Sequence, residues 1–87
     1  MPVLHDEVPT PPEQKGLIMR TLMEQLTEAG ADLVLVDGIK ARSAEGWALV
    51  VPDPEDPVTH VWAEAGDLVA SERLAASYVE RITSMLG

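Results

Sequence analysis

Carboxylate side chains are concentrated in one short, proline-containing segment that runs from Val51 to Pro57. Carboxylate oxygens are the ligands that Ca²⁺ and Mg²⁺ prefer, so Asp53, Glu55 and Asp56, with His60 nearby, have the chemistry of a hard-cation site. The prolines restrict this segment, however, and the spacing of the acids does not match an EF-hand. A solvated acidic turn is therefore the favoured interpretation, and we predict no metal ligand.

The two histidines, His5 and His60, are the side chains best suited to acid–base chemistry near neutral pH. A catalytic triad would also need a nucleophile, but the chain has no cysteine and no serine stands in a recognisable order with either histidine. We therefore expect structural roles for both histidines. The sequence predicts no catalytic residue and no cofactor.

Length and charge limit the classes of function. The chain has 87 residues, enough for one domain, with 15 acidic and 6 basic residues and a formal charge of −9. Because nucleic acids and anionic lipids are bound through Lys and Arg, we expect neither as a partner. The lack of cysteine excludes disulfides. Since no segment has the pattern of a signal peptide or a spanning helix, we expect a cytoplasmic protein.

Short strands are expected on both sides of the acidic segment. Residues 39–42 and 47–51 flank a turn at 43–46 and predict an antiparallel hairpin, and 58–65 predicts a further strand. Two other segments have a strand-like composition, and they are residues 3–8 and 32–36, the latter ending at the Asp37-Gly38 turn.

Two amphipathic helices complete the predicted elements. Thr10-Pro11-Pro12-Glu13 has the hydroxyl, proline and glutamate of a capping box, and an apolar stripe follows it up to Gly30. Either Asp67 or Ser71 is suited to cap the second helix. The stripe of this second helix consists of Leu74, Ala75, Tyr78, Val79, Ile82, Met85 and Leu86.

The order of strand, helix, three or four strands and helix predicts a single α+β domain. We expect a mostly antiparallel four-stranded sheet with both helices packed on one face and the other face open. Trp47 and Trp62 are expected in the core, because the chain has no Phe and one Tyr to supply bulk. Lys15 and Arg20 are expected to form surface ion pairs.

Several motifs resemble the C-terminal, fourth domain of the α-D-phosphohexomutases, the family of phosphomannomutase and phosphoglucomutase. They occur in the same order over nearly the whole chain, and they are Val8-Pro9-Thr10-Pro11-Pro12-Glu13-Gln14-Lys15-Gly16, Asp37-Gly38-Ile39, Gly46-Trp47-Ala48-Leu49-Val50, Pro57 and Val61-Trp62-Ala63-Glu64-Ala65. The resemblance implies that residues 1–87 form one TATA-box-binding-protein-like domain of the phosphoglucomutase C-terminal type. It also implies that this domain is part of a longer protein.

The resemblance also gives the acidic segment a role. In the family, a loop of the form Arg-Pro-Ser-Gly/Asn-Thr-Glu-Pro binds the phosphate of the sugar phosphate. The corresponding substrate-binding residues here are Val51, Pro52, Asp53, Pro54, Glu55, Asp56 and Pro57, of which the flanking prolines match. Val51 lacks the guanidinium, Asp53 and Glu55 replace donors with acceptors, and Pro54 removes an N–H. Three carboxylates would each cost a bound phosphate about 1–3 kcal/mol at a separation of about 6 Å.

The resemblance therefore implies an accessory domain with a degenerate phosphate loop and no catalysis on its own, in contact with the other domains of its parent protein. The expected parent is a sugar-phosphate transferase or mutase, either a mannose-1-phosphate guanylyltransferase or a phosphomannomutase-like protein. One alternative stays open. A divergent but working fourth domain would help to bind a sugar phosphate, weakly, through other residues such as Lys40 or Arg42.

Overall fold

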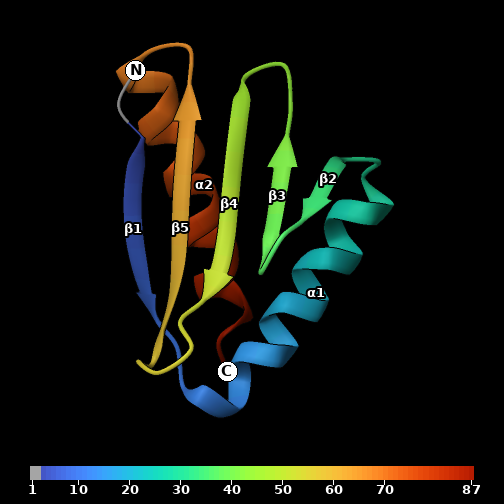
Figure 1. Ribbon diagram of the computed structural model, residues 1–87, viewed down its shortest axis with the longest axis vertical. Coiled ribbons are helices and arrows are strands. Elements are labelled where there is room, and N and C mark those ends of the chain that lie inside the picture. Colours follow the sequence, from blue (N-terminus) through green and yellow to red (C-terminus); the bar gives the residue numbers. More distant parts are fainter. Residues whose placement is uncertain (1–2) are drawn as a thin grey trace.

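Five antiparallel strands form one sheet in the computed structural model, which describes residues 3–87 (Figure 1). The strand order across the sheet is β1-β5-β4-β3-β2. The strands are β1 Leu4–Pro9, β2 Asp32–Leu35, β3 Ile39–Arg42, β4 Gly46–Pro52 and β5 Val58–Ala65. The helices are the short 3₁₀ turn η1 Pro12–Gln14, α1 Lys15–Glu28 and α2 Leu68–Met85.

The predicted α+β class is confirmed, but the predicted count of four strands is wrong. Both of the short outer segments join the sheet as edge strands, since β1 pairs with β5 and β2 pairs with β3. An edge strand needs hydrogen bonds on one side only, so four or six residues are enough to complete the ladder. The order of elements along the chain agrees with the prediction.

The two helices cover the same face of the sheet. Side chains alternate between the faces along each strand, and those that face the helices are buried. Ile18 and Leu22 of α1 and Ile82 of α2 share one core with Val50 and Val61 of the two central strands. In Figure 1, α2 crosses behind β1, β5 and β4, and α1 lies beside β3 and β2.

The helix starts differ from each other. At the first helix the predicted capping box is wrong, because the Thr10 hydroxyl is buried and donates to the Val8 carbonyl oxygen at 2.8 Å instead of capping. The Thr59 hydroxyl of β5 lies 2.9 Å from the Thr10 hydroxyl, so this contact joins β5 to the residue that follows β1. At the second helix Asp67 is the cap, since its carboxylate accepts from the Ala70 N–H at 2.8 Å.

Gly38 and Gly46 are required where the backbones of neighbouring strands approach closely. A Cβ at Gly38 would overlap the carbonyl oxygen of Val50, and one at Gly46 would overlap the carbonyl oxygen of Glu64. Asp37 takes the left-handed conformation, with φ of 56°, that a turn of this kind needs. The two glycine motifs singled out in the sequence are therefore explained by strand packing.

Neither tryptophan lies in the core, so that prediction is wrong. Trp47 and Trp62 are half-buried and point to the open face of the sheet, because they alternate with the buried Ala48 and Val61. Trp47 donates to the Glu64 carboxylate at 3.3 Å, and the ammonium of Lys40 lies 4.7 Å from the centre of its ring. The core is filled instead by aliphatic side chains of the helices and of the sheet face that they cover.

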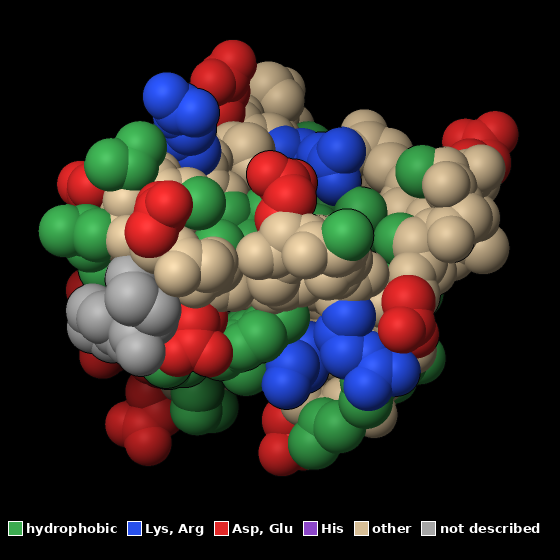
Figure 2. Space-filling model, turned by 90° about the horizontal axis from the view of Figure 1, so that it is seen from above, with side chains coloured by type: hydrophobic (Ala, Val, Ile, Leu, Met, Phe, Trp, Pro, Cys, Tyr) green, Lys and Arg blue, Asp and Glu red, His purple; other side chains and the backbone are tan. Residues whose placement is uncertain are grey.

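Charged side chains of both signs lie at the surface of one end of the molecule (Figure 2). On the end of the molecule seen in Figure 2, acidic and basic groups are interspersed, with hydrophobic side chains between them. Among residues 3–87, no helix is both long and apolar enough to cross a membrane.

Candidate functional site

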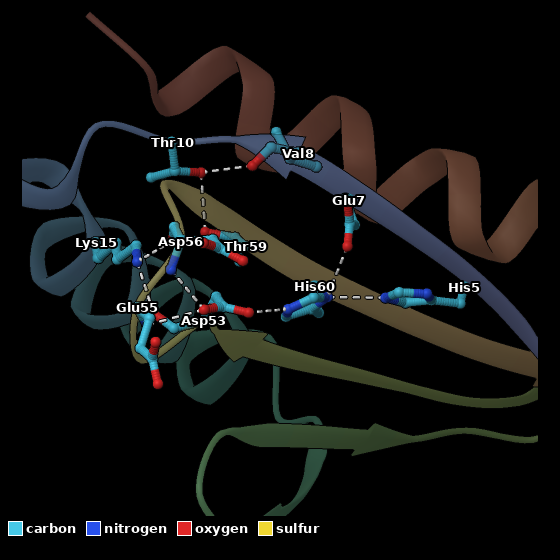
Figure 3. Close-up of polar contacts among 10 residues, drawn as sticks. All are labelled: His5, Glu7, Val8, Thr10, Lys15, Asp53, Glu55, Asp56, Thr59 and His60. Atoms are coloured by element: carbon cyan, nitrogen blue, oxygen red, sulfur yellow. Dashed lines mark hydrogen bonds and ion pairs between the residues drawn. The ribbon is translucent and has the colours of Figure 1, made fainter.

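The loop between β4 and β5 is closed by its own hydrogen bonds (Figure 3). The Asp53 carboxylate accepts from the backbone N–H of Glu55 at 2.8 Å and from that of Asp56 at 2.7 Å. Backbone bonds join Asp53 to Val58 at 3.0 Å and Thr10 to Pro57 at 2.7 Å. Both N–H groups that converge inside the loop are therefore already bound to an internal anion.

Lys15 lies against this loop, from the first turn of α1. Its ammonium donates to the backbone carbonyl oxygens of Asp53, at 2.6 Å, and of Asp56. The prediction of a surface ion pair for Lys15 is wrong, because the cation is bound to the loop backbone. The positive charge nearest to the loop thus holds the loop to the helix.

Asp53 is also bound to His60, whose Nε2 lies 2.8 Å from the carboxylate. The hydrogen bond from His60, together with those from the backbone of Asp56 and Glu55, holds the pKa of Asp53 far below its ordinary value of 3.8. An ionised carboxylate only accepts, so Nε2 of His60 carries the proton. In the neutral ring, Nδ1 of His60 is then an acceptor that faces away from the loop.

His5 and Glu7 of β1 lie on the other side of the His60 ring. Nε2 of His5 is 2.8 Å from Nδ1 of His60, and a carboxylate oxygen of Glu7 is 3.7 Å from the same nitrogen. The His5 and His60 rings both stack on Trp62, with ring centres 4.7 and 5.2 Å from that of the indole. The acidic loop is thus continuous with a cluster of imidazole and carboxylate groups on the open face.

The sequence interpretation grouped His60 with the acids of the loop, and the structure brings His60 together with Asp53 but not with the side chains of Glu55 and Asp56. The sequence interpretation did not bring His5 together with His60, and it did not name Glu7. His5 and Glu7 are two residues apart and so lie on the same face of β1. Glu7 lies directly opposite His60 in the β1–β5 pairing. A His-x-Glu pattern in an edge strand is a signal, but the register is needed to interpret it.

Lys40 and Arg42 are placed away from the loop. Lys40 lies opposite Leu49, which is four residues or about 13 Å along β4 from Asp53. Arg42 lies opposite Trp47, about 20 Å from Asp53 by the same reckoning, and forms an ion pair of 3.1 Å with Asp32. By this reckoning neither cation lies next to the acidic loop.

Two curated proteins are similar to this chain, and each is named "Probable phosphoglucosamine mutase". The one from Methanopyrus kandleri is 32% identical over 79 residues, which cover 91% of this chain and 18% of that protein. The one from Methanocella arvoryzae is 33% identical over 70 residues, which cover 77% of this chain and 16% of that protein. These matches support a phosphohexomutase-family domain.

The chain spans less than a fifth of the length of these curated relatives. No family model matches it. The likeness to a phosphohexomutase domain, expected from the motifs, is confirmed at the level of the family. Both relatives are named as mutases and neither as a guanylyltransferase, so the matches give no support to the latter parent.

Proposed function

We propose that this phosphohexomutase-like domain is a C-terminal accessory domain of a longer sugar-phosphate-metabolising protein, with a degenerate phosphate loop and no catalysis on its own. One observation carries the proposal. The two backbone N–H groups that converge inside the loop are bound by the carboxylate of Asp53. This internal carboxylate takes the place that a phosphate oxygen would need.

The remaining loop chemistry supports the same conclusion. A phosphate is bound through converging N–H groups and a cation, preferably the planar fork of an arginine. Val51 supplies no charge, and the ammonium of Lys15 already donates to two backbone carbonyl oxygens. A phosphate entering this loop would have to displace Asp53 and would meet the exposed side chains of Glu55 and Asp56.

The proposed parent is a mutase-like protein, since the matching curated proteins are named as mutases. A mannose-1-phosphate guanylyltransferase is the second possible parent. The proposed partners are the other domains of that protein, at the open sheet face and the acidic loop. A charge of −9 disfavours nucleic acids and anionic membranes as partners. The proposal includes a cytoplasmic location and the TATA-box-binding-protein-like fold type.

A divergent but working fourth domain is the second candidate, favoured by the position of Lys15. Its ammonium lies 2.6 Å from the Asp53 carbonyl oxygen and is the cation nearest to the loop among those with described contacts. In this alternative, Lys15 would leave the loop carbonyls and bind a sugar phosphate that the other domains hold in place. Lys40 and Arg42 are less suitable because of their distance from the loop.

Titration of the ¹⁵N-labelled domain with sugar phosphates distinguishes the two candidates. Glucosamine 1-phosphate and mannose 1-phosphate are added to millimolar concentration, and unphosphorylated glucosamine and mannose are the controls. An accessory domain is expected to show no phosphate-dependent amide shifts over residues 51–58. Saturable shifts there that require the phosphate would overturn the accessory proposal and support the working domain.

A loop-restored variant gives the titration a positive control. Val51→Arg, Asp53→Ser, Pro54→Gly and Glu55→Thr together return the residue types of the family's loop to their positions. Because the change removes the internal anion and adds a guanidinium, we expect phosphate-dependent shifts in the variant alone. If neither protein responds, the Lys15→Met change is made in the full-length parent protein, where the other domains are present. An unchanged KM for the sugar phosphate would then exclude the second candidate.

A further inference from the structure

We propose that His5, Glu7 and His60 form a binding site for a divalent transition-metal ion of the zinc class. The three residues each present one ligand atom, and these atoms lie within 4.8 Å of one another on the open face of the sheet (Figure 3). They come from two paired strands, in which Glu7 lies opposite His60 and His5 lies on the same face of β1 as Glu7. The proposal is independent of the function proposed for the domain.

The spacing of the ligand atoms fits a tetrahedral ion. Zinc bonds to imidazole nitrogen and carboxylate oxygen are about 2.0–2.1 Å long, which sets neighbouring ligand atoms about 3.3 Å apart. Two of the three separations lie on either side of this value, 2.8 Å from Nε2 of His5 to Nδ1 of His60 and 3.7 Å from the Glu7 carboxylate to the same nitrogen, and all three are within 4.8 Å. His5 and Glu7 are exposed, so their side chains are free to make the adjustment.

The hydrogen bond between the two imidazoles is the competing state. With the proton of His60 on Nε2, Nδ1 offers a lone pair, and Nε2 of His5 donates to it. Binding a metal requires His5 to carry its proton on Nδ1 instead, a change of tautomer and not of charge. One hydrogen bond at an exposed site is then exchanged for two metal–nitrogen bonds.

Asp53 supplies the outer support that metal-binding histidines have. Its carboxylate accepts from Nε2 of His60 at 2.8 Å and so fixes the tautomer in which Nδ1 is a ligand. Asp53 is held in turn by the backbone N–H groups of Glu55 and Asp56. The side chains of His60 and Asp53 are 15% and 18% exposed, so this pair forms the rigid part of the site.

The ligand set determines the class of ion. Two imidazoles and one carboxylate suit Zn²⁺, Co²⁺ or Ni²⁺, whereas Mg²⁺ and Ca²⁺ take oxygen ligands. Three protein ligands leave a fourth position for water or for a group of a partner. Because the ion would join the edge strand β1 to β5, binding would also raise the free energy of unfolding by mass action.

Calorimetric titration of the untagged, EDTA-treated domain with zinc chloride tests the site. We expect one equivalent to bind, with affinity lowered about tenfold or more in His5→Ala and in His60→Gln. Glu7→Gln is the carboxylate variant, and Glu55→Gln is its matched control, an acid of the same neighbourhood outside the site. The control is expected to bind zinc as the unchanged protein does.

Two further measurements separate this site from non-specific binding to acids. Cobalt(II) is expected to give the strong visible absorption of a four-coordinate ion, and this band should be lost in His5→Ala, which replaces an exposed side chain and should fold. Magnesium at the same concentration is expected not to compete. Undiminished zinc affinity in both histidine variants, equal loss in Glu55→Gln and Glu7→Gln, or no saturable binding at one equivalent would each overturn the proposal.

Discussion

The two faces of the sheet come from the same five strands but carry different chemistry. On the helix-covered face the central side chains are small or aliphatic and 1% exposed or less, as at Ala48, Val50, Val61 and Ala63. On the open face several of the residues in between carry rings or charges. These residues are His60, Trp62 and Glu64 of β5, Trp47 of β4 and Lys40 of β3.

This difference separates what holds the fold from what is available for binding. Burial against the helices stabilises the domain, and many aliphatic side chains would serve there. The open-face groups are joined by hydrogen bonds and by stacking at a half-exposed surface, where each contact contributes little to stability. The side chains available for binding are therefore those of the open face and of the loop that continues from it.

Truncation of a core side chain should show the largest difference in stability between the two faces. Leu22 is fully buried in the core beneath α1, so Leu22→Ala is expected to lower the free energy of unfolding by about 2–5 kcal/mol. The total free energy of unfolding of a domain of this length is roughly 4–13 kcal/mol. Leu49→Ala on the open face is the matched control and should cost no more than about 1.5 kcal/mol. Equal losses in urea unfolding would show that the open face is covered in solution.

The β3–β4 register determines which residues occupy each face, and Gly38 is a point at which to break it. A Cβ there would overlap the Val50 carbonyl oxygen, so Gly38→Ala is expected to destabilise the domain by more than about 1 kcal/mol. Gly16→Ala is the control, because it lies in α1 with open space around its Cα. That change should stabilise by about 0.5–1 kcal/mol in the same urea measurement. A neutral Gly38→Ala would show that the strands separate easily.

The helix-covered face was predictable because burial leaves a period in the sequence. The apolar stripes of both helices were found from spacing alone. Ile82 of the second stripe lies in the core as expected, together with Ile18 and Leu22 of the first helix. The motif of a capping box did not reveal where the Thr10 hydroxyl lies. Thr10 has two competing partners, and the contact with Thr59, 49 residues away, depends on strand pairing that local sequence does not contain.

The open face was harder to predict because its contacts join distant strands. His5 and His60 are 55 residues apart in the sequence. The distance of 2.8 Å between Nε2 of His5 and Nδ1 of His60 follows from the β1–β5 register. The cluster of acids and prolines at residues 51–57 could be seen in the sequence. The internal binding of Asp53 could not, because an acid in a turn is equally able to face solvent.

The acidic loop should make part of the stability depend on pH, whereas the aliphatic face should not. The folded-state pKa of Asp53 is held far below its ordinary value of 3.8 by His60 and by the backbone N–H groups of Asp56 and Glu55. A carboxylate with a lowered pKa stabilises the fold above the unfolded value and loses that contribution as the pH falls through the folded one. Asp53→Asn is thus expected to lower Tm near neutral pH, with a difference from the unchanged protein that narrows in acid.

Glu55→Gln is the matched control for this titration, since Glu55 contributes to the Asp53 contact through its backbone and keeps that hydrogen bond when the side chain changes. Its Tm should follow that of the unchanged protein from neutral pH into acid. A Tm difference for Asp53→Asn that stays constant over the whole range would mean that the Asp53 side chain acts by shape and not by charge. The internal-anion explanation of the loop would then fail, because Asp53 protonated in acid would hold the loop as well as ionised Asp53 does at neutral pH.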